Sequence, residues 1–474
     1  MGRSDRPWRC GCYVLVALAF SFVDLSFADL NAVNGKSPPS DQDLEATVDS
    51  YLKDYVDGNN FSGTVLLARG DTVLLSKGYG MSVFEHATPN FEETRFQIAS
   101  VSKSFTAAAI LLLQERGELE LHDPVSRFIP EFPRGNEITI RDLLAHTSGL
   151  PRFVFFPDFA EKSQHRHTTQ DLVEWLLDKP LVSSPGEQYN YSNANYAMLA
   201  HIIEHVSNLT YGNFIKLNIL DPMYLRDTGH RESASKIVRN LAFSYVPVGL
   251  NELERSRYFD YSIYTGSGSI YSTVPDLFQW FQTLQTEKLL NRVTRKRMLD
   301  ETGSPFGYGW LPEKRLDRDA LVMRGWDGVG FSANFVHFLT EDMTVIVLSN
   351  LNMSSITAEV ANSIAAIGLD EEFDPLEVLR KPNIDGHSLA EMAGLYRFGS
   401  DFYVPDATIH IVESNGQLLI PANAFGPEGG LLPVSDNSFI HRQQWLRVTF
   451  ERAADGKVTG MQYGQFKAKK EREQ

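Results

Sequence analysis

The 474-residue sequence is poor in cysteine, and both of its cysteines, Cys10 and Cys12, lie close to the N-terminus. Disulfides therefore cannot cross-link the rest of the chain, and its stability must come from core packing. Basic residues are also in the minority, with 44 Lys and Arg against 60 Asp and Glu and a formal net charge of -16. Binding to phosphate backbones or anionic lipids needs clustered cations, so we expect no nucleic-acid partner.

Long hydrophobic runs are scarce as well. The apolar run from Cys12 to Val23 is shorter than the ~20 residues that a membrane-spanning helix needs. Three arginines precede this run and small residues end it at Ala28, which predicts a signal peptide over residues 1–28. An uncleaved N-terminal anchor is the alternative. We expect a secreted or periplasmic protein whose mature chain has no membrane span.

The composition is that of a globular protein, with 43% hydrophobic and 22% charged residues. The chain is long for one compact domain, and we expect two. A linker containing proline and glycine is predicted over 373–389. It separates a larger domain, 29–372, from a small C-terminal β domain, 390–474, in which short alternating runs predict strands.

Within the larger domain, strands are predicted near both ends and helices between them. Ser62 to Leu67 and Thr72 to Gly78 predict a β-hairpin, and strand patterns return at Ala333 to Phe338 and Met343 to Leu348. The stretch from about Ile138 to Asp260 has several helical patterns broken by turns, which predicts an inserted helical lobe.

Ser100-Val101-Ser102-Lys103 is the first segment with catalytic chemistry. The helical pattern from Val101 to Leu113 places Ser100 at a helix N-terminus, where backbone N–H groups favour a developing oxyanion. Residues three apart share a helix face, so the Lys103 amine would lie beside the Ser100 hydroxyl and act as its base. Ser50 to Lys53 and Ser233 to Lys236 have the same spacing, but only Ser100 precedes the profile of a buried helix.

Tyr191-Ser192-Asn193 is the second such segment, and a helical pattern follows it. The Tyr191 hydroxyl would relay a proton between Ser100, Lys103 and the leaving group. The Asn193 amide would donate to a substrate carbonyl.

These residues resemble the serine β-lactamase and penicillin-binding protein superfamily, nearest the branch of class C β-lactamases, D-alanyl-D-alanine carboxypeptidases, D-aminopeptidases and related esterases. Further segments agree in order: Ser62 to Val65, Thr94 to Ser100, Leu121 to Val125, Leu143 to Pro151, Tyr189 to Asn193, Gly307 to Trp310 and Val347 to Asn350. The resemblance runs from about Leu44 to Ile367. It implies an α/β (α+β) fold with an antiparallel sheet flanked by helices, an inserted helical lobe, and a C-terminal domain like the small β-barrels of some relatives.

By the same resemblance, Ser100 is the nucleophile, Lys103 the base, Tyr191 the proton relay and Asn193 a substrate ligand. No cofactor is implied, and the partner is a small-molecule or peptide-like substrate.

The third family motif, usually Lys-Thr-Gly or His-Xaa-Gly, is where the chain departs from the family. It reads Arg324-Gly325-Trp326-Asp327-Gly328-Val329-Gly330-Phe331. Either Arg324 or Trp326 takes the basic position, and both stay open. An arginine would bind a substrate carboxylate and a tryptophan an apolar acyl group. The backbone N–H of Asp327 or Val329 would then complete the oxyanion site with that of Ser100.

We therefore predict a serine hydrolase that acts through an acyl-enzyme on an ester or a peptide-like amide, with weak or absent β-lactamase turnover. A non-catalytic ligand binder is one alternative. A zinc peptidase is another, because His201 and His205 in His201-Ile202-Ile203-Glu204-His205 match an inverted zincin pattern. His146 has a predicted packing role only.

Overall fold

The computed structural model describes residues 41–300, 306–371, 384, 386–402, 406–421 and 428–471. The predicted signal peptide and both cysteines lie outside these ranges, as does most of the predicted linker. The domain boundaries proposed above therefore stay predictions.

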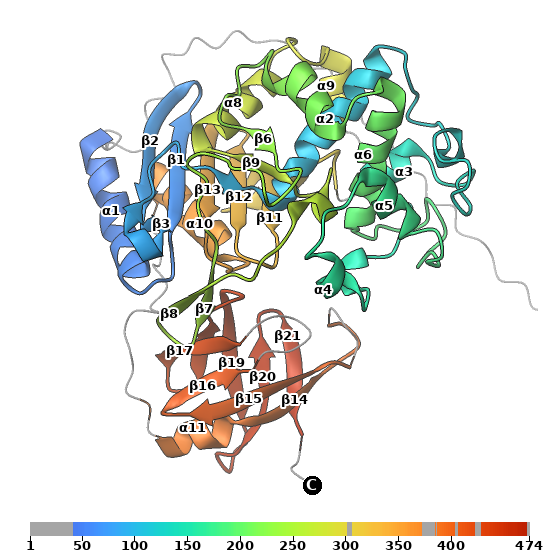
Figure 1. Cartoon of the computed structure of the whole chain (residues 1–474). Coiled ribbons are helices and arrows are strands. Elements are labelled where there is room, and N and C mark those ends of the chain that lie inside the picture. Colours follow the sequence, from blue (N-terminus) through green and yellow to red (C-terminus); the bar gives the residue numbers. More distant parts are fainter. Residues whose placement is uncertain are drawn as a thin grey trace, which may run out of the picture. The chain divides into compact units, whose positions relative to one another are not determined.

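Six strands of the described residues form one antiparallel sheet, in the order β10-β11-β12-β13-β1-β2 (Figure 1). Their bounds are β1 Gly63–Arg69, β2 Thr72–Tyr79, β10 Leu311–Arg315, β11 Arg318–Trp326, β12 Ser332–Phe338 and β13 Met343–Ser349. β1 pairs with β13 from Gly63 opposite Ser349 to Arg69 opposite Met343. The predicted hairpin and the two later strands are confirmed, and strands from opposite ends of the domain meet in one sheet.

Both faces of this sheet are buried. Side chains alternate between faces along a strand, and in β1 Val65 and Leu67 join one hydrophobic cluster while Leu66 and Ala68 join another. The helices α1 (Asp41–Asp57) and α10 (Ile356–Gly368) contribute to the first cluster, and α2 (Ser102–Glu115) and α8 (Val274–Leu284) to the second. The result is a three-layer helix, sheet and helix arrangement.

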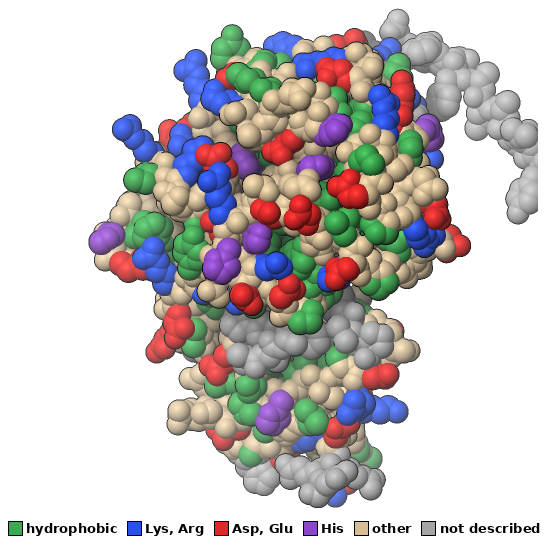
Figure 2. Space-filling model, turned by 45° about the vertical axis from the view of Figure 1, so that its right-hand side comes forward, with side chains coloured by type: hydrophobic (Ala, Val, Ile, Leu, Met, Phe, Trp, Pro, Cys, Tyr) green, Lys and Arg blue, Asp and Glu red, His purple; other side chains and the backbone are tan. Residues whose placement is uncertain are grey.

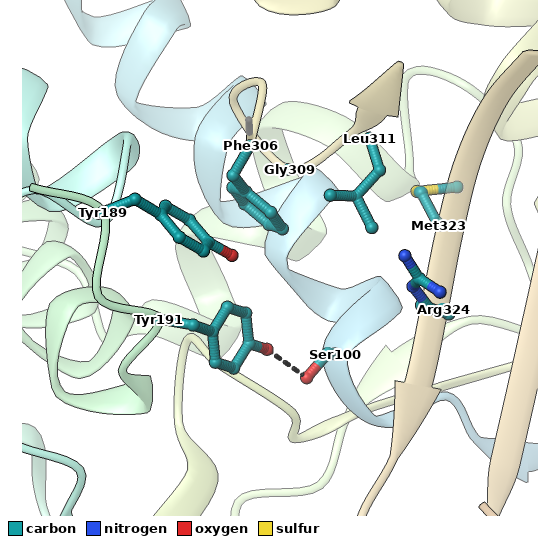
Figure 3. A pocket seen from close by; sticks show the side chains of 8 residues that line it. All are labelled: Ser100, Tyr189, Tyr191, Phe306, Gly309, Leu311, Met323 and Arg324. Carbon is teal, nitrogen blue, oxygen red and sulfur yellow. Dashed lines mark hydrogen bonds between the residues drawn. The ribbon is translucent and has the colours of Figure 1, made fainter. Parts of the chain in front are cut away.

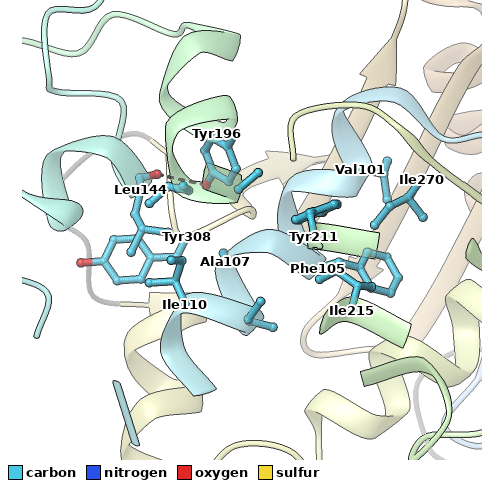
Figure 4. Packing of buried hydrophobic residues seen from close by; sticks show 14 of the residues in the cluster. Val101, Phe105, Ala107, Ile110, Leu144, Tyr196, Tyr211, Ile215, Ile270 and Tyr308 are labelled. Carbon is cyan, nitrogen blue, oxygen red and sulfur yellow. Dashed lines mark hydrogen bonds between the residues drawn. The ribbon is translucent and has the colours of Figure 1, made fainter. Parts of the chain in front are cut away.

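Helix α2 is the centre of the second cluster. Each of its residues from Ser102 to Leu113 is buried, in keeping with the small and apolar pattern that predicts it. Phe105 stacks on Trp280 of α8 at a centroid distance of 4.3 Å. Figure 4 shows side chains of the helical lobe, including Tyr196 and Tyr211, packed around this helix. Burial on all sides fixes the start of α2, and with it Ser100.

The predicted helical lobe is present between the strands, with additional short strands. Its helices are α3 Ile140–Leu144, α4 Phe159–Lys162, α5 Thr169–Glu174, α6 Asn193–Ser207 and α7 Tyr211–Ile215, and α9 is Arg292–Asp300. The short strands are β3 Met81–Val83, β4 Thr88–Pro89, β5 Phe96–Gln97, β6 Gly229–His230, β7 Tyr245–Val248, β8 Glu252–Arg255 and β9 Ile270–Ser272. The β7-β8 hairpin was not predicted, because it lies within a stretch whose pattern is mainly helical.

The C-terminal segment is a closed barrel, as the resemblance implied. In the described residues, eight strands close it in sequence order, and β14 pairs with β21. The bounds are α11 Gly386–Met392, β14 Gly394–Phe398, β15 Thr408–Ser414, β16 Gln417–Ile420, β17 Gly429–Ser435, β18 Ser438–His441, β19 Leu446–Arg452, β20 Val458–Tyr463 and β21 Phe466–Lys470. Its interior has a hydrophobic cluster of its own, so the barrel has a separate core.

Arg442 connects the barrel with the larger domain. Its side chain is buried and donates hydrogen bonds to the Asn60 side chain and to the carbonyls of Asn59, Val248 and Glu252. A buried guanidinium is costly unless its N–H groups are paired. The unpredicted β7-β8 hairpin supplies two of these acceptors and so anchors the barrel.

The molecular surface carries charges of both signs. On the face in Figure 2, basic and acidic side chains are interspersed. Several charged residues of the described ranges form exposed ion pairs, such as Arg134 with Glu137, and solvent screening keeps the contribution of such pairs to stability small. None of the helices within the described ranges is long and apolar enough to cross a membrane.

Candidate active site

Ser100 lies in a tight turn that leads directly into α2. The turn is a 3-10 segment, Ala99–Val101. Ala99 has a φ of 46°, a left-handed conformation that costs an L-residue about 1–2 kcal/mol. The hydrogen bond from the Ile98 N–H to the Ile270 carbonyl helps to hold this turn. Local strain of this kind is typical of functional turns, and here it presents the Ser100 hydroxyl at the head of the buried helix.

The Ser100 hydroxyl has two functional neighbours. Its Oγ lies 3.0 Å from Lys103 Nζ and 2.7 Å from the Tyr191 hydroxyl oxygen. Both distances are within hydrogen-bond reach. The structure thus brings together the three residues that the sequence assigned to proton transfer.

Lys103 is fully buried, and its amine is held on three sides. Besides Ser100, Nζ donates to Asn193 Oδ1 at 2.8 Å and to the Ser267 carbonyl at 2.7 Å. Burial lowers the pKa of Lys103 well below its usual value. A neutral amine has two N–H groups, which the two carbonyl oxygens accept. Its lone pair is then left facing Ser100 Oγ.

The His146 ring packs against the Tyr191 ring. The two rings lie 4.4 Å apart, and His146 Nδ1 accepts hydrogen bonds from Asn195 Nδ2 at 2.9 Å and from the Ser192 N–H at 3.3 Å. Burial lowers the pKa of His146, so its ring stays neutral, and burial raises the pKa of the Tyr191 phenol, which stays protonated. His146 therefore supports the tyrosine and the loop that carries it.

A pocket opens beside Ser100 and has a volume of about 210 Å³. Figure 3 shows the Tyr191 and Ser100 side chains on one side of it and Arg324 on the other. Its lining residues are Ser100, Tyr189, Tyr191, Phe306, Gly309, Leu311, Met323 and Arg324. Apolar groups predominate, with one cation at the rim.

Of the two residues considered for the third motif, Arg324 is the one that lines the pocket. Arg324 lines the pocket and pairs with Glu313 of β10 at 2.8 Å. The Trp326 indole is not among the described lining residues, and its Nε1 donates to Asn352 Oδ1 at 2.7 Å. This hydrogen bond ties the Trp326 ring to Asn352, so a contact of the ring with an acyl group stays a prediction.

The two N–H groups predicted to complete the oxyanion site have acceptors within their own loop in this structure. The Val329 N–H donates to Asp327 Oδ1 at 2.8 Å, and the Asp327 N–H donates to the Phe331 carbonyl at 3.2 Å. Asp327 itself is buried and is not a substrate ligand by this geometry. Both N–H groups are already used by the loop that follows β11.

Strand geometry points to the Trp326 N–H in their place. N–H directions alternate along an antiparallel strand. The Asp327 N–H points to Phe331, the residue before β12, so the Trp326 N–H points away from β12. In the described residues, β10 pairs with β11 only as far as Leu311 opposite Val322, which leaves this edge open. A Cβ on Gly325 would lie 2.8 Å from the Ser100 nitrogen, so only glycine lets the strand approach so closely.

The other matches to the Ser-Xaa-Xaa-Lys pattern lack this setting. Lys53 is 68% exposed and pairs with Asp57, and Lys236 is 49% exposed and pairs with Glu232. Both amines therefore face solvent, whereas the Lys103 amine is buried. Burial of the lysine distinguishes the functional match from chance matches.

The zinc-peptidase alternative finds no metal site. Thr169 Oγ1 lies 3.2 Å from His201 Nδ1, and Glu204 accepts a hydrogen bond from the Tyr211 N–H at 2.7 Å. His205 packs edge-on against Phe128. Within the described ranges, no group of three metal-ligating residues is arranged to hold an ion. These side chains instead join α6 to its neighbours.

Comparison with known proteins places the chain in a family. The family model described as Beta-lactamase matches residues 48–367, more than half of the sequence. The chain belongs to the β-lactamase family. The six-stranded sheet, Ser100, the buried Lys103 and the Tyr191 loop described above all lie within the matched region, and the expected resemblance is confirmed.

Individual relatives extend this match. Penicillin-binding protein 4* of Bacillus subtilis is 28% identical over 417 residues, which cover 84% of this chain and 91% of the relative. The structure of an octameric penicillin-binding protein homologue from Pyrococcus abyssi has a TM-score of 0.62 at 22% identity and covers 90% of this chain and 99% of its own. D-amino acid amidase from Ochrobactrum anthropi SV3 has the same TM-score and identity, with 69% and 98% covered. The predicted fold class is confirmed, and the family supports a serine hydrolase type.

Sequence reasoning missed several residues of the site. Ser267 acts through its carbonyl, which has no residue-type signature. Phe306, Leu311 and Met323 line the pocket, but apolar residues in these segments also fit an ordinary core. Asn193 was predicted to bind substrate, and the structure shows its carbonyl oxygen on Lys103.

Proposed function

We propose that the protein is a serine hydrolase that cleaves esters or peptide-like amides through an acyl-enzyme on Ser100. The observation that carries this proposal is the position of Ser100 Oγ between the Lys103 amine, at 3.0 Å, and the Tyr191 hydroxyl, at 2.7 Å. A serine alcohol needs such a base to become a nucleophile. Family membership and amidase and penicillin-binding relatives support the same chemistry.

The proton transfers balance with these three residues. Ser100 Oγ attacks the carbonyl carbon and passes its proton to Lys103 Nζ. Tyr191 donates its phenol proton to the leaving oxygen or nitrogen, and Lys103 returns the first proton to the phenolate. Water then attacks the acyl carbonyl and loses a proton to the same pair. The pair returns a proton to Ser100 Oγ as the acyl C–Oγ bond breaks, which releases the acid and restores the free enzyme.

The oxyanion formed in each step would be stabilised by the Ser100 N–H and the Trp326 N–H. Both are backbone donors whose positions are fixed before substrate binds, so stabilisation needs no reorganisation during the reaction. The largely apolar pocket would hold the acyl group, and Arg324 at its rim would bind a carboxylate on the substrate. Met323 and Arg324 in place of a Lys-Thr-Gly motif support weak or absent β-lactamase turnover.

A substrate panel tests the proposal. Wild-type protein should hydrolyse at least one member of a set of p-nitrophenyl esters and D-amino acid amides and turn over nitrocefin slowly or not at all. Ser100→Ala should abolish this hydrolysis, while Ser233→Ala, at a chance match to the same pattern, should keep it. A folded wild-type protein that cleaves no ester or amide and takes no fluorophosphonate label would instead favour a non-catalytic ligand binder.

We also propose that the chain is exported, on the basis of the N-terminal sequence pattern alone. Determination of the mature N-terminus from the native source tests this, with residue 29 as the expected start. A native protein that begins at residue 1 would contradict cleavage.

A further inference from the structure

Asp327 has more hydrogen-bond donors around its carboxylate than an ordinary turn requires. Oδ1 accepts the N–H groups of Val329, Gly330 and Phe331, at 2.8, 2.8 and 3.0 Å. Oδ2 accepts the hydroxyl of Tyr261 at 2.6 Å. The residue is 5% exposed. Four donors on one buried carboxylate fix both its own position and that of the loop around it.

These contacts connect two segments that are distant in sequence. Asp327 follows the last residue of β11, and Tyr261 belongs to the 3-10 segment Tyr261–Tyr264. The Asp327 carbonyl also accepts the hydroxyl of Tyr264 at 3.4 Å. The end of β11 is therefore tied to this segment through both the side chain and the backbone of one residue.

Each of the two connected segments touches the catalytic residues. The 3-10 segment leads to Ser267, whose carbonyl holds the Lys103 amine. On the other segment, Gly325 lies against the Ser100 nitrogen, and the Trp326 N–H points to the open strand edge. Asp327 thus joins the support of the base to the strand that carries the second oxyanion donor.

We propose that Asp327 is a positioning residue that fixes the Trp326 N–H for oxyanion stabilisation. This inference rests on the proposed function. Oxyanion donors act by being held in place before charge develops, and small displacements weaken them strongly. Four hydrogen bonds to its carboxylate fix Asp327, and Asp327 directly follows the residue that carries the donor N–H. Tyr261 donates one of these bonds and so shares the positioning role.

The test compares three variants with matched chemistry. Asp327→Ala removes the acceptor of all four bonds, and Tyr261→Phe removes one of them. Asp276→Asn is the control, because Asp276 is also buried and accepts from the Asp227 N–H and the Thr228 hydroxyl, both at 2.8 Å, at the start of α8. Melting temperatures are measured for all three, and active sites are counted by complete labelling with a fluorophosphonate.

Two readouts separate positioning from folding. One is kcat/KM for the best p-nitrophenyl ester, per labelled site. The other is the affinity for a boronic acid, whose tetrahedral adduct places an oxygen in the oxyanion site. A displaced Trp326 N–H stabilises the oxyanion less well. Both kcat/KM and the boronic acid affinity should therefore fall by about tenfold or more in Asp327→Ala, and by about threefold in Tyr261→Phe. Asp276→Asn should leave both within about twofold of wild type even if its melting temperature falls equally.

The opposite results would overturn the inference. One such result is a wild-type kcat/KM and boronic acid affinity in Tyr261→Phe or in a folded Asp327→Ala. The other is a loss of both in Asp276→Asn as large as the loss in Asp327→Ala. If Asp327→Ala does not fold, Tyr261→Phe decides, because it removes a single oxygen. A wild-type protein that hydrolyses no ester overturns the proposed function and this inference together, whereas an active wild type with unaffected variants overturns the inference alone.

Discussion

The hydroxyl oxygen of Tyr191 lies 2.7 Å from the Oγ of Ser100. The phenol ring is packed on its far side by His146, so this contact is held by the loop and does not depend on substrate. Because burial raises the pKa of Tyr191, the phenol is protonated at neutral pH and can donate to a leaving group.

Tyr191→Phe should therefore lower kcat/KM for an ester by about 10²-fold, the usual contribution of a positioned proton donor. Tyr189→Phe is the matched control, because Tyr189 lines the same pocket, and it should stay within a few-fold of wild type. Steady-state rates per labelled site measure the difference. Equal losses in both variants would show that Tyr191 acts only as a wall of the pocket.

Protonation of Lys103 should produce the acid limb of the pH profile of kcat/KM. Its pKa is lowered by burial, and only the neutral amine accepts a proton, so kcat/KM should be full above this pKa and fall as pH decreases through it. The limb should lie well below the pH range in which an exposed lysine titrates.

The matching variants are Lys103→Ala and Lys236→Ala. Lys103→Ala should lose about 10³-fold in kcat/KM and the acid limb with it, whereas Lys236→Ala, at an exposed chance match, should keep the wild-type profile. An unchanged limb in Lys103→Ala would assign that titration to another group.

Arg324 and Glu313 should set the preference for charged substrates. The two form an ion pair at the pocket rim, with Arg324 51% exposed, so the expected effects are modest. Arg324→Ala should raise KM about three- to tenfold for an ester that carries a carboxylate and leave a neutral ester of the same size unchanged. Glu313→Gln removes the competing anion and should lower the same KM. Effects of equal size on both esters would rule out carboxylate recognition here.

Acid should destabilise the barrel through His441. Burial lowers the pKa of His441 to about 3, against 6.5 unfolded, so the unfolded chain binds more protons between these values. The contribution of His441 to the free energy of unfolding is then fully present above pH 6.5. It decreases toward pH 3 by up to about 1.4 kcal/mol per pH unit for one histidine.

Thermal unfolding from pH 7 to pH 4 checks this, with the barrel's exposed His410 as control. His441→Gln should flatten the pH dependence, because glutamine can still accept from the Tyr463 hydroxyl but takes up no proton. His410→Gln should leave the slope as in wild type. Identical slopes in the two variants would contradict the assignment to His441.

Local patterns were sufficient for the elements that one segment determines alone. The helix after Ser100 is buried along its length, so its composition departs visibly from that of a surface helix. Ser100, Lys103 and Tyr191 could be proposed because the buried-helix profile after Ser100 and the family resemblance distinguish this match from the two others with the same spacing.

The third motif could not be assigned in this way. Counting back from Gly330-Phe331 puts Arg324 at the basic position, whereas matching the final glycine of the family triplet puts Trp326 there. The path of this segment depends on the loop that Asp327 holds through Tyr261, 66 residues away. Such tertiary hydrogen bonds have no local signature. The same holds for the Ser267 carbonyl on Lys103 and for the pairing of β14 with β21 that closes the barrel.

The most direct test of the account is to trap the acyl-enzyme. Wild-type protein is quenched in acid during turnover of the best ester, and intact mass and peptide mapping locate the adduct. The account predicts the mass of one acyl group on the peptide that contains Ser100, absent in Ser100→Ala and retained in Ser233→Ala. Full hydrolytic activity in Ser100→Ala, or an adduct on any other residue, would contradict it.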